Sequence, residues 1–229
     1  NAQYRGFFWA NGVMSDLGGI HPNGLSFATG INDSDTVVGT AATFINSSEY
    51  RYQVVWDASG AALEAPQVLN EGWAKKINDA GQILSINDSI GVVRVFGGGL
   101  PSWTDFGIHG QQGDAWDINS SGVVIGNYDD LVIRWTGGVR EVLFSGTPYA
   151  INDAGVIVGQ FRGELGYSAF RFNGATATPI LGMDVARDVN NLGVIVGYSG
   201  NIERAMLWDG ALHDLNDLVA PGTEAVLRQ

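Results

Sequence analysis

The sequence predicts an all-β protein, a β-propeller of about six four-stranded blades, from two motifs that alternate along the chain. One motif is a tight turn of the type Ile-Asn-Asp-x-Gly followed by residues such as Val-Val-Gly, and the other is a short strand that ends in an aromatic residue. No stretch shows the periodicity of an amphipathic helix. Short strands at regular spacing, with turn signals between them, are typical of all-β folds.

The turn motif is clearest at residues 150–159. Ile151 ends one strand, and Asn152 and Asp153 begin a turn, because their side chains hydrogen-bond to nearby backbone. Gly155 can take the positive φ that closes a hairpin, and β-branched residues then open the next strand. The block recurs at residues 31–39, 77–85, 118–126 and 189–197. This recurrence indicates a repeat protein.

The aromatic motif opens the chain and precedes a turn that contains Gly. Its anchoring residues are Trp9, Trp56, Phe96, Trp135, Phe172 and Trp208. They lie 36 to 47 residues apart, close to the ~40–45 residues of a four-stranded propeller blade. We expect the four tryptophans among these anchors to pack between blades, because aromatic side chains bury large areas.

Two hairpins per unit give four strands per unit and a single domain that spans residues 1–229. Five blades remain an alternative, and so does a β-solenoid, although a solenoid usually has shorter coils and does not need two hairpins per turn. A sandwich would not require a repeated sequence. The long spacers at residues 40–51 and 57–71 predict surface loops of variable length.

The two ends of the sequence predict how such a ring closes. An aromatic-type hairpin at residues 7–17 has no Asn-type hairpin before it, and residues 224–229 resemble the start of another Asn-type hairpin. In a ring the last blade is then shared between the two termini, with one strand position vacant at its edge. Because an unpaired strand edge is a template for another strand, we expect either residues beyond Gln229 or a neighbouring molecule to fill it, and the second alternative predicts self-association through this edge.

Composition excludes several classes of partner and chemistry. The chain has 24 acidic and 12 basic residues, and its net charge of −12 argues against nucleic acid and against an anionic membrane surface. Without cysteine there is no disulfide, thiolate metal site or cysteine nucleophile. No apolar run approaches the ~20 residues of a membrane span.

Metal and catalytic signals are weak. The Asn-Asp turns could attract calcium, but calcium takes about six oxygen ligands and each turn offers two side chains, so we expect no metal and no cofactor. The histidines are far apart and predict loop residues: His21, His109 and His213. There is no Gly-x-Ser-x-Gly nucleophile motif, and Asp129 and Asp130 predict an exposed turn. We therefore predict no catalytic residue.

Three tryptophans fall outside the anchor register: Trp73, Trp103 and Trp116. These are our candidate ligand-binding residues, because aromatic platforms outside the core pattern suit a sugar-binding or partner-binding face. Burial at sheet edges is the alternative. The residues between the flanking Ala and the Ile or Val also vary in the blocks 74–77, 115–118 and 186–189, as expected of positions that face a channel or its mouth.

These repeated pieces resemble the HAF repeat of bacterial extracellular proteins. The similarity lies in an Ala-Phe-Leu-Trp-like strand, an Asp-Leu-Gly strand end and the Ile-Asn-Asp-x-Gly block, and it covers essentially the whole chain. Corresponding segments here are residues 168–172, 204–208, 14–18 and 28–33. The resemblance implies secretion or display on the cell surface, and no known catalytic activity.

We therefore expect an extracellular, non-enzymatic propeller that serves as a binding or assembly module for another protein or a surface glycan. One alternative is a structural subunit of an extracellular polymer or coat. The other is an enzyme similar to propeller glycosidases, which would need two carboxylates about 5–10 Å apart.

Overall fold

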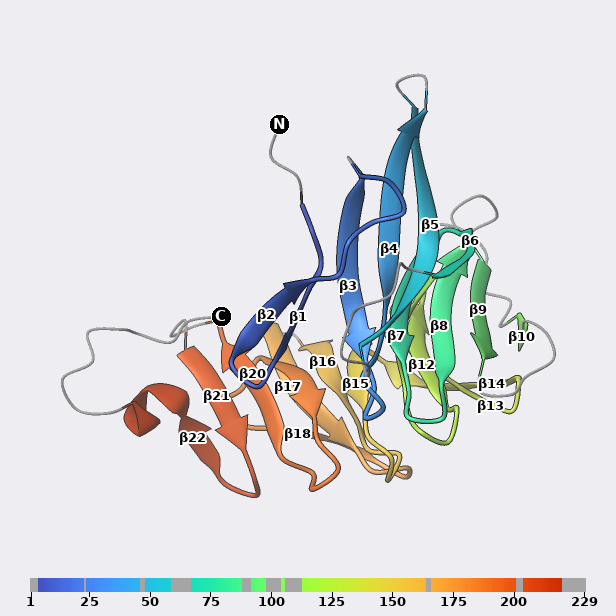
Figure 1. The fold of residues 1–229 in the computed structure, drawn as a ribbon. Coiled ribbons are helices and arrows are strands. Elements are labelled where there is room, and N and C mark those ends of the chain that lie inside the picture. Colours follow the sequence, from blue (N-terminus) through green and yellow to red (C-terminus); the bar gives the residue numbers. More distant parts are fainter. Residues whose placement is uncertain are drawn as a thin grey trace. The chain divides into compact units, whose positions relative to one another are not determined.

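The computed structural model describes residues 4–22, 24–45, 48–58, 67–87, 92–97, 104–105, 113–163, 166–200 and 204–219. The chain divides into two compact units, Asn1–Gln112 and Gly113–Gln229, and each is described by itself. Figure 1 shows the strands of both units, coloured along the sequence. The predicted joining of residues 224–229 to the first hairpin lies outside the described residues.

The described regular structure is β throughout, apart from one turn of 3₁₀-helix, η1 (Leu215–Leu218). The strands of the first unit are β1 (Phe7–Ala10), β2 (Val13–Asp16), β3 (Leu25–Ile31), β4 (Thr36–Ile45), β5 (Ser48–Asp57), β6 (Gln67–Glu71), β7 (Trp73–Ile77), β8 (Gln82–Asn87), β9 (Val92–Gly97) and β10 (Thr104–Asp105). Those of the second unit are β11 (Gly113–Ile118), β12 (Val124–Tyr128), β13 (Leu131–Thr136), β14 (Val139–Ser145), β15 (Thr147–Ile151), β16 (Ile157–Gly163), β17 (Gly166–Phe172), β18 (Ala177–Pro179), β19 (Val185–Val189), β20 (Ile195–Ser199), β21 (Arg204–Trp208) and β22 (Leu212–Asp214).

Across the described residues, these strands form five four-stranded sheets and one two-stranded sheet, all antiparallel. The first unit contains β1–β2, β3–β6 and β7–β10, and the second contains β11–β14, β15–β18 and β19–β22. Within each four-stranded sheet the strands follow chain order, so the Asn-type hairpin supplies the first two strands and the aromatic motif the third. The predicted all-β fold with four-stranded repeats is confirmed, and no described helix is long and apolar enough to cross a membrane.

The Asn-type turns close as their residues predict. Asn152 Oδ1 accepts a hydrogen bond from Val156 N at 2.9 Å, and the Gly155 N–H donates to Asn152 O at 2.9 Å. Gly155 has a φ of 78°, the left-handed region that glycine adopts without strain. In the first such turn Asp35 replaces this glycine and takes a φ of 56°, which Asp tolerates better than most residues.

Hydrogen bonds also join the turns of neighbouring sheets, and we call this series the Asn ladder. In each rung the side-chain Nδ2 of one turn Asn donates to the backbone O of the next: Asn32 to Asn78 at 3.3 Å in the first unit, and Asn119 to Asn152 at 3.1 Å and Asn152 to Asn190 at 3.0 Å in the second. The residue after the Asn adds a second bond, as where Asp153 N donates to Asn191 Oδ1 at 3.0 Å. The turns therefore join sheets as well as strands.

The glycine that ends the Val-Val-Gly segment is required by a close backbone approach. This position is held by Gly39, Gly126, Gly159 and Gly197. A Cβ built on Gly159 would overlap the carbonyl oxygen of Thr147 on the adjacent strand, and the other three glycines face an equivalent carbonyl. Any side chain here would push the first strand away from the second.

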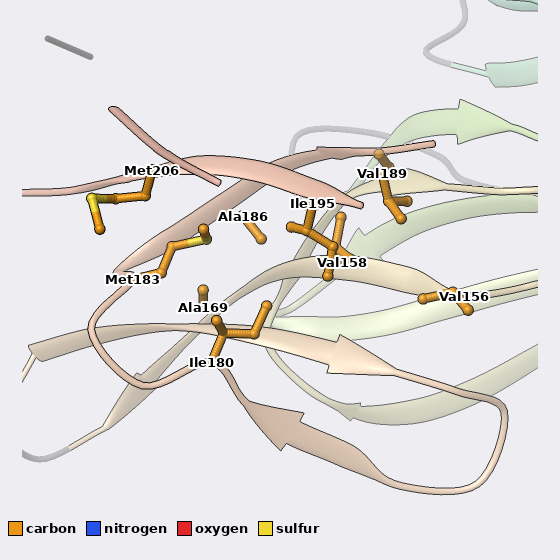
Figure 2. Packing of buried hydrophobic residues seen from close by; sticks show 10 residues of the cluster. Val156, Val158, Ala169, Ile180, Met183, Ala186, Val189, Ile195 and Met206 are labelled. Atoms are coloured by element: carbon orange, nitrogen blue, oxygen red, sulfur yellow. The ribbon is translucent and has the colours of Figure 1, made fainter. Parts of the chain in front are cut away.

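The cores lie between successive sheets. In the second unit, Val158 of β16, Ala186 and Val189 of β19 and Met206 of β21 belong to one buried cluster, and Figure 2 shows this cluster with Met206 toward one end and Val189 toward the other. Each such cluster combines side chains from two successive sheets, so removal of one sheet would expose the face of the next. This is the packing that a propeller blade requires.

The anchor tryptophans meet their prediction unevenly. Trp56 and Trp135 are fully buried, and Trp208 is half-buried against the cluster of Figure 2. The expectation was wrong for Trp9, whose side chain is 63% exposed. Among the described residues its strand, β1, belongs to a sheet of two strands, whereas Trp56 and Trp135 lie on sheets of four.

The expected loop at residues 40–51 was also wrong. Its described residues continue β4 and β5 as a long hairpin, with Ile45 paired with Ser48 at the far end. Phe44 and Tyr50, on the two strands of this hairpin, are exposed. The described part of residues 57–71 includes β6, so this spacer also is only partly a loop.

Candidate functional site

A β-bulge recurs in the first strand of every four-stranded sheet. In each case the register shifts just after the residue that aligns with the Ala of the repeat, so one extra residue interrupts the ladder. These bulge residues are Thr29, Lys75, Trp116, Tyr149 and Arg187. Bulges bend a strand and redirect a side chain, and they are frequent beside functional sites.

In the second unit the three bulge residues meet. The rings of Trp116 and Tyr149 pack edge to face with centroids 5.2 Å apart. The Arg187 guanidinium carbon lies 4.5 Å from the centroid of the Tyr149 ring and 5.5 Å from that of Tyr198, the distances of cation–π contacts. Arg187 Nη2 also donates to the Tyr198 hydroxyl at 3.4 Å. We call Trp116, Tyr149, Arg187 and Tyr198 the bulge cluster.

Neighbouring groups hold the bulge cluster in place. Trp116 is half-buried, and its Nε1 donates to Asn127 Oδ1 at 2.7 Å, which fixes the plane of the indole. Burial raises the pKa of Tyr149 above the usual value of 10, and the positive charge of Arg187 opposes part of that rise. Tyr149 therefore keeps its proton at neutral pH, so its hydroxyl can donate a hydrogen bond to a ligand.

A pocket of about 450 Å³ opens beside the cluster. Tyr149, Tyr198 and Tyr167 provide aromatic walls, and Gln160 and Asp184 provide polar groups. Asp184 Oδ2 accepts a hydrogen bond from Gly200 N at 2.7 Å and another from Ser199 Oγ at 3.4 Å, so its carboxylate is held in position. The volume lies within the range of about 300–1,000 Å³ that is usual for small-molecule sites.

The three predicted tryptophans have different outcomes. Trp116 belongs to the bulge cluster. Trp73 is half-buried in the first unit, and the Arg51 guanidinium carbon lies 4.3 Å from its ring centroid, so Trp73 already has a cationic partner. Trp103 lies outside the described residues. Whether any of them binds a ligand stays a prediction.

The other sequence signals form no second site in the part of the chain that the structure describes. Asp129 and Asp130 make a hairpin turn with φ values of 47° and 61°, as predicted. His213 Nε2 lies 3.0 Å from Asp209 Oδ1 on the surface, and this contact is the main cause of the lowered pKa of Asp209. No group of three or more metal-ligating side chains occurs among the described residues.

Sequence reasoning missed Tyr149 and Tyr198. Pro148 replaces the usual Ala before Tyr149, so this block did not match the others and its variable residue was overlooked. The available signal was the position of Tyr149 relative to Ile151, Asn152 and Asp153, which marks the same bulge. Tyr198 directly follows Gly197, at a position where the other sheets of the unit have Asn127 and Gln160, so the repeat does not mark it.

Comparisons with known proteins indicate the fold of the chain. No family model and no curated protein matches the chain. Among solved structures, the chain is similar to an acylaminoacyl peptidase from Pyrococcus horikoshii, with 9% identity, a TM-score of 0.59 and coverage of 85% of this chain and 40% of that one. An acylaminoacyl peptidase in complex with Z-Gly-Gly-Phe-chloromethyl ketone has 13% identity and a TM-score of 0.60, over 89% of this chain and 40% of that one.

TolB from Acinetobacter baumannii is similar as well, with 11% identity, a TM-score of 0.53 and coverage of 88% of this chain and 54% of that one. TolB has a β-propeller, and the repeated four-stranded sheets found here are propeller-like. By these coverages, this chain spans about half or less of the length of the three proteins. At such low identity the similarity concerns the fold and not the activity.

Proposed function

We propose that the protein is a non-enzymatic binding module whose bulge cluster and adjoining pocket bind a glycan. The observation that carries this proposal is the meeting of Trp116, Tyr149 and Arg187, all from β-bulges, beside a pocket with aromatic walls and a few polar groups. Each of three successive sheets contributes one bulge residue to the bulge cluster. These residues differ between the sheets, whereas the turns and strands beside the bulges have similar sequences in each.

The chemistry of the pocket suits a neutral, hydroxyl-rich ligand. Aromatic rings present flat apolar faces to the C–H groups of a sugar, while amide, carboxylate and phenol groups can bond to its hydroxyls. Gln160, Asp184 and the tyrosine hydroxyls supply these polar groups in the pocket. Such a mixture of aromatic walls and a few polar groups is typical of small-molecule sites.

An enzyme of the glycosidase type receives less support from this pocket. That reaction uses two carboxylic acids on either side of the bond that is broken. Among the described residues that line the pocket, Asp184 is the one acid. A single carboxylate that already accepts bonds from Ser199 and Gly200 suits ligand positioning better than acid–base chemistry.

The test is glycan binding by the intact protein and by Tyr167→Ala. Tyr167 lines the pocket and is 55% exposed, so its loss should weaken binding strongly without changing the melting temperature. Tyr50→Ala is the matched control, because Tyr50 is also an exposed tyrosine on a strand but does not line this pocket. A glycan array identifies the ligand, and titration calorimetry measures the change in affinity.

A second pair of variants separates ligand binding from stability. Trp116→Ala should remove binding and, because the indole is half-buried and not fully enclosed, should cost clearly less stability than Trp135→Ala, which should cost roughly 3–5 kcal/mol as a core cavity. Equal destabilisation by both changes would show that Trp116 is a core residue. Equal glycan binding by the intact protein and Tyr167→Ala would refute the proposed site.

We also propose that the repeated sheets close into a ring of about six blades and that the protein acts outside the cell, as the resemblance to HAF repeats implies. The support for the ring is the common sheet architecture and its likeness to the TolB propeller. Small-angle scattering should give a radius of gyration near ~17 Å for a compact particle of this length. An elongated particle would refute the ring.

A further inference from the structure

Two sheets of the second unit carry an arginine at the same position of the repeat, and these two arginines have different partners. Arg134 of β13 and Arg171 of β17 each stand directly before the anchor aromatic. Arg134 faces Glu141 on β14, whereas Arg171 faces Thr178 on β18. The sheet of β11–β14 therefore serves as an internal control for the sheet of β15–β18.

Glu141 supplies Arg134 with a carboxylate, and Thr178 supplies Arg171 with none. Nη2 and Nε of Arg134 donate to Glu141 Oε2 at 2.6 and 3.1 Å. Arg171 forms no ion pair in the part of the chain that the structure describes, and its Nε is buried there without a hydrogen-bond partner. Because a buried donor without an acceptor costs free energy, an external carboxylate that reached this Nε would remove that cost.

A groove of about 320 Å³ opens at Arg171, and residues of the β17–β18 and β21–β22 hairpins line it. One wall includes Trp208 and Leu212, which pack against the buried cluster of Figure 2, and the other includes Pro179 and Ile180. The Arg171 guanidinium carbon lies 5.8 Å from the centroid of the Trp208 ring, within reach of a cation–π contact. The groove thus combines one cation with walls that are chiefly apolar.

The acid in the β21–β22 turn, Asp209, is engaged by its own hairpin. Its Oδ1 accepts a hydrogen bond from Ala211 N at 3.2 Å and lies 3.0 Å from His213 Nε2. The described residues that line the groove include no Asp or Glu. An anion that enters the groove therefore meets the charge of Arg171 with no carboxylate of the lining to oppose it.

We propose that this groove binds a small carboxylic acid with an apolar body. The carboxylate pairs with the Arg171 guanidinium and accepts from its Nε, as Glu141 does with Arg134, and the apolar body lies along Trp208 and Leu212. Charge and walls together define this class of ligand. A neutral apolar molecule leaves the Nε of Arg171 unpaired, and an inorganic anion leaves the apolar walls uncovered.

Octanoate is the probe, and octanamide, which has the same apolar body without the charge, is its control. Titration calorimetry of the intact protein at neutral pH should show saturable binding of octanoate, with a dissociation constant in the millimolar range or tighter for a ligand of this size. Octanamide should bind about tenfold or more weakly, because it cannot form the charge-assisted hydrogen bonds with Arg171.

Matched arginine variants locate the carboxylate. Arg171→Gln should weaken the binding of octanoate by about tenfold or more, the loss expected for one hydrogen bond to a charged group, and should hardly change the affinity for octanamide. Arg134→Gln is the control, because Arg134 has the same place in its sheet but already pairs with Glu141 and does not line the groove. It should leave the affinity for octanoate unchanged.

Thr178→Glu tests the same contact from the other strand. It places a carboxylate opposite Arg171, as Glu141 stands opposite Arg134. The new side chain should pair with Arg171 and weaken octanoate binding by about tenfold or more, without lowering the melting temperature. Thr176→Glu adds the same charge to the same hairpin at an exposed residue outside the groove lining, and should leave binding unchanged.

Three results would overturn the proposal. Absence of saturable octanoate binding by the intact protein would show that the groove is closed in solution or filled by another part of the chain. Equal affinity for octanoate and octanamide would show that the groove does not select a carboxylate, and unchanged octanoate binding by Arg171→Gln would place the ligand elsewhere. The glycan test changes Tyr167 and Trp116, which do not line this groove, so the two proposals fail independently.

Discussion

The Asn ladder can be tested by changing one atom in a side chain. Asn152→Asp keeps the Oδ1 that accepts from Val156 N but replaces Nδ2, which donates to Asn190 O at 3.0 Å, by an oxygen. The change removes a hydrogen bond worth about 1 kcal/mol and places two acceptors against each other at a buried site, at a further cost of about 1–3 kcal/mol. We expect a total loss of about 2–4 kcal/mol at pH 7.

Asn190→Asp is the matched control. Asn190 has the same place in its turn, and its Oδ1 accepts a hydrogen bond from Val194 N at 2.9 Å. Among the described residues, however, no following turn accepts a hydrogen bond from its Nδ2. Its replacement should cost less than about 0.5 kcal/mol, as is usual at the surface. Urea unfolding monitored by tryptophan fluorescence gives both values, and the difference between them measures the rung itself.

The pH dependence of this difference gives a second check. In the Asn152→Asp variant a protonated carboxyl group could donate to Asn190 O, and burial between acceptors raises the pKa of that new carboxyl. The extra cost of Asn152→Asp should therefore shrink as the pH is lowered from 7 toward 5, while the cost of Asn190→Asp stays nearly constant. Equal losses for the two variants at pH 7 would refute the ladder as a source of stability.

Three further predictions concern packing, the backbone and acid stability. Trp135→Ala should cost roughly 3–5 kcal/mol in thermal or urea unfolding, whereas Trp9→Ala should cost less than about 1 kcal/mol because its ring is exposed; similar losses would mean that Trp9 is covered in solution. Gly159→Ala should lower stability by about 2 kcal/mol or more because its Cβ meets backbone, against about 1 kcal/mol for Gly155→Ala, whose Cβ would meet no other group but whose φ is positive; the reverse order would contradict the close approach. The pKa of Asp153 is lowered chiefly by a hydrogen bond that its carboxylate accepts from the backbone N–H of Ser120 in the neighbouring turn. The stability that the ionised carboxylate contributes is therefore present above the pKa of the unfolded state and is lost as the pH falls through the lower pKa of the folded state. Asp153→Asn should flatten the loss of stability below about pH 4, and an unchanged dependence of stability on acid pH would exclude this contribution of Asp153.

Much of the fold could be predicted because the same local sequence signals for turns and strands recur in every repeat. The turn at Asn152 and the strand that follows are specified by side-chain hydrogen bonding and β-branching, which act within a few residues. The bonds between turns could not be read in the same way. They depend on how sheets pack, and a turn Asn looks the same whether or not its Nδ2 reaches the next sheet.

The candidate site was only partly predictable for a related reason. Trp116 attracted notice as an aromatic outside the anchor register, and Arg187 as a variable residue in its block. Their contact through Tyr149 depends on β-bulges, which shift the register by one residue and leave no composition signal of their own. The prediction for Trp9 failed for a different reason: its sequence is that of a core anchor, but in the described part of the chain its strand belongs to a sheet of two strands.

The acceptor in each ladder rung has a consequence for how such a chain can change its length. Nδ2 of one turn Asn binds a main-chain oxygen of the next turn, so the bond does not depend on which side chain that neighbour carries. A unit of about forty residues could be duplicated or lost by recombination, and the turns newly brought together would still bond without compensating substitutions. The variable bulge residues would meanwhile be reshuffled, so one genetic event could preserve the scaffold and alter the binding surface.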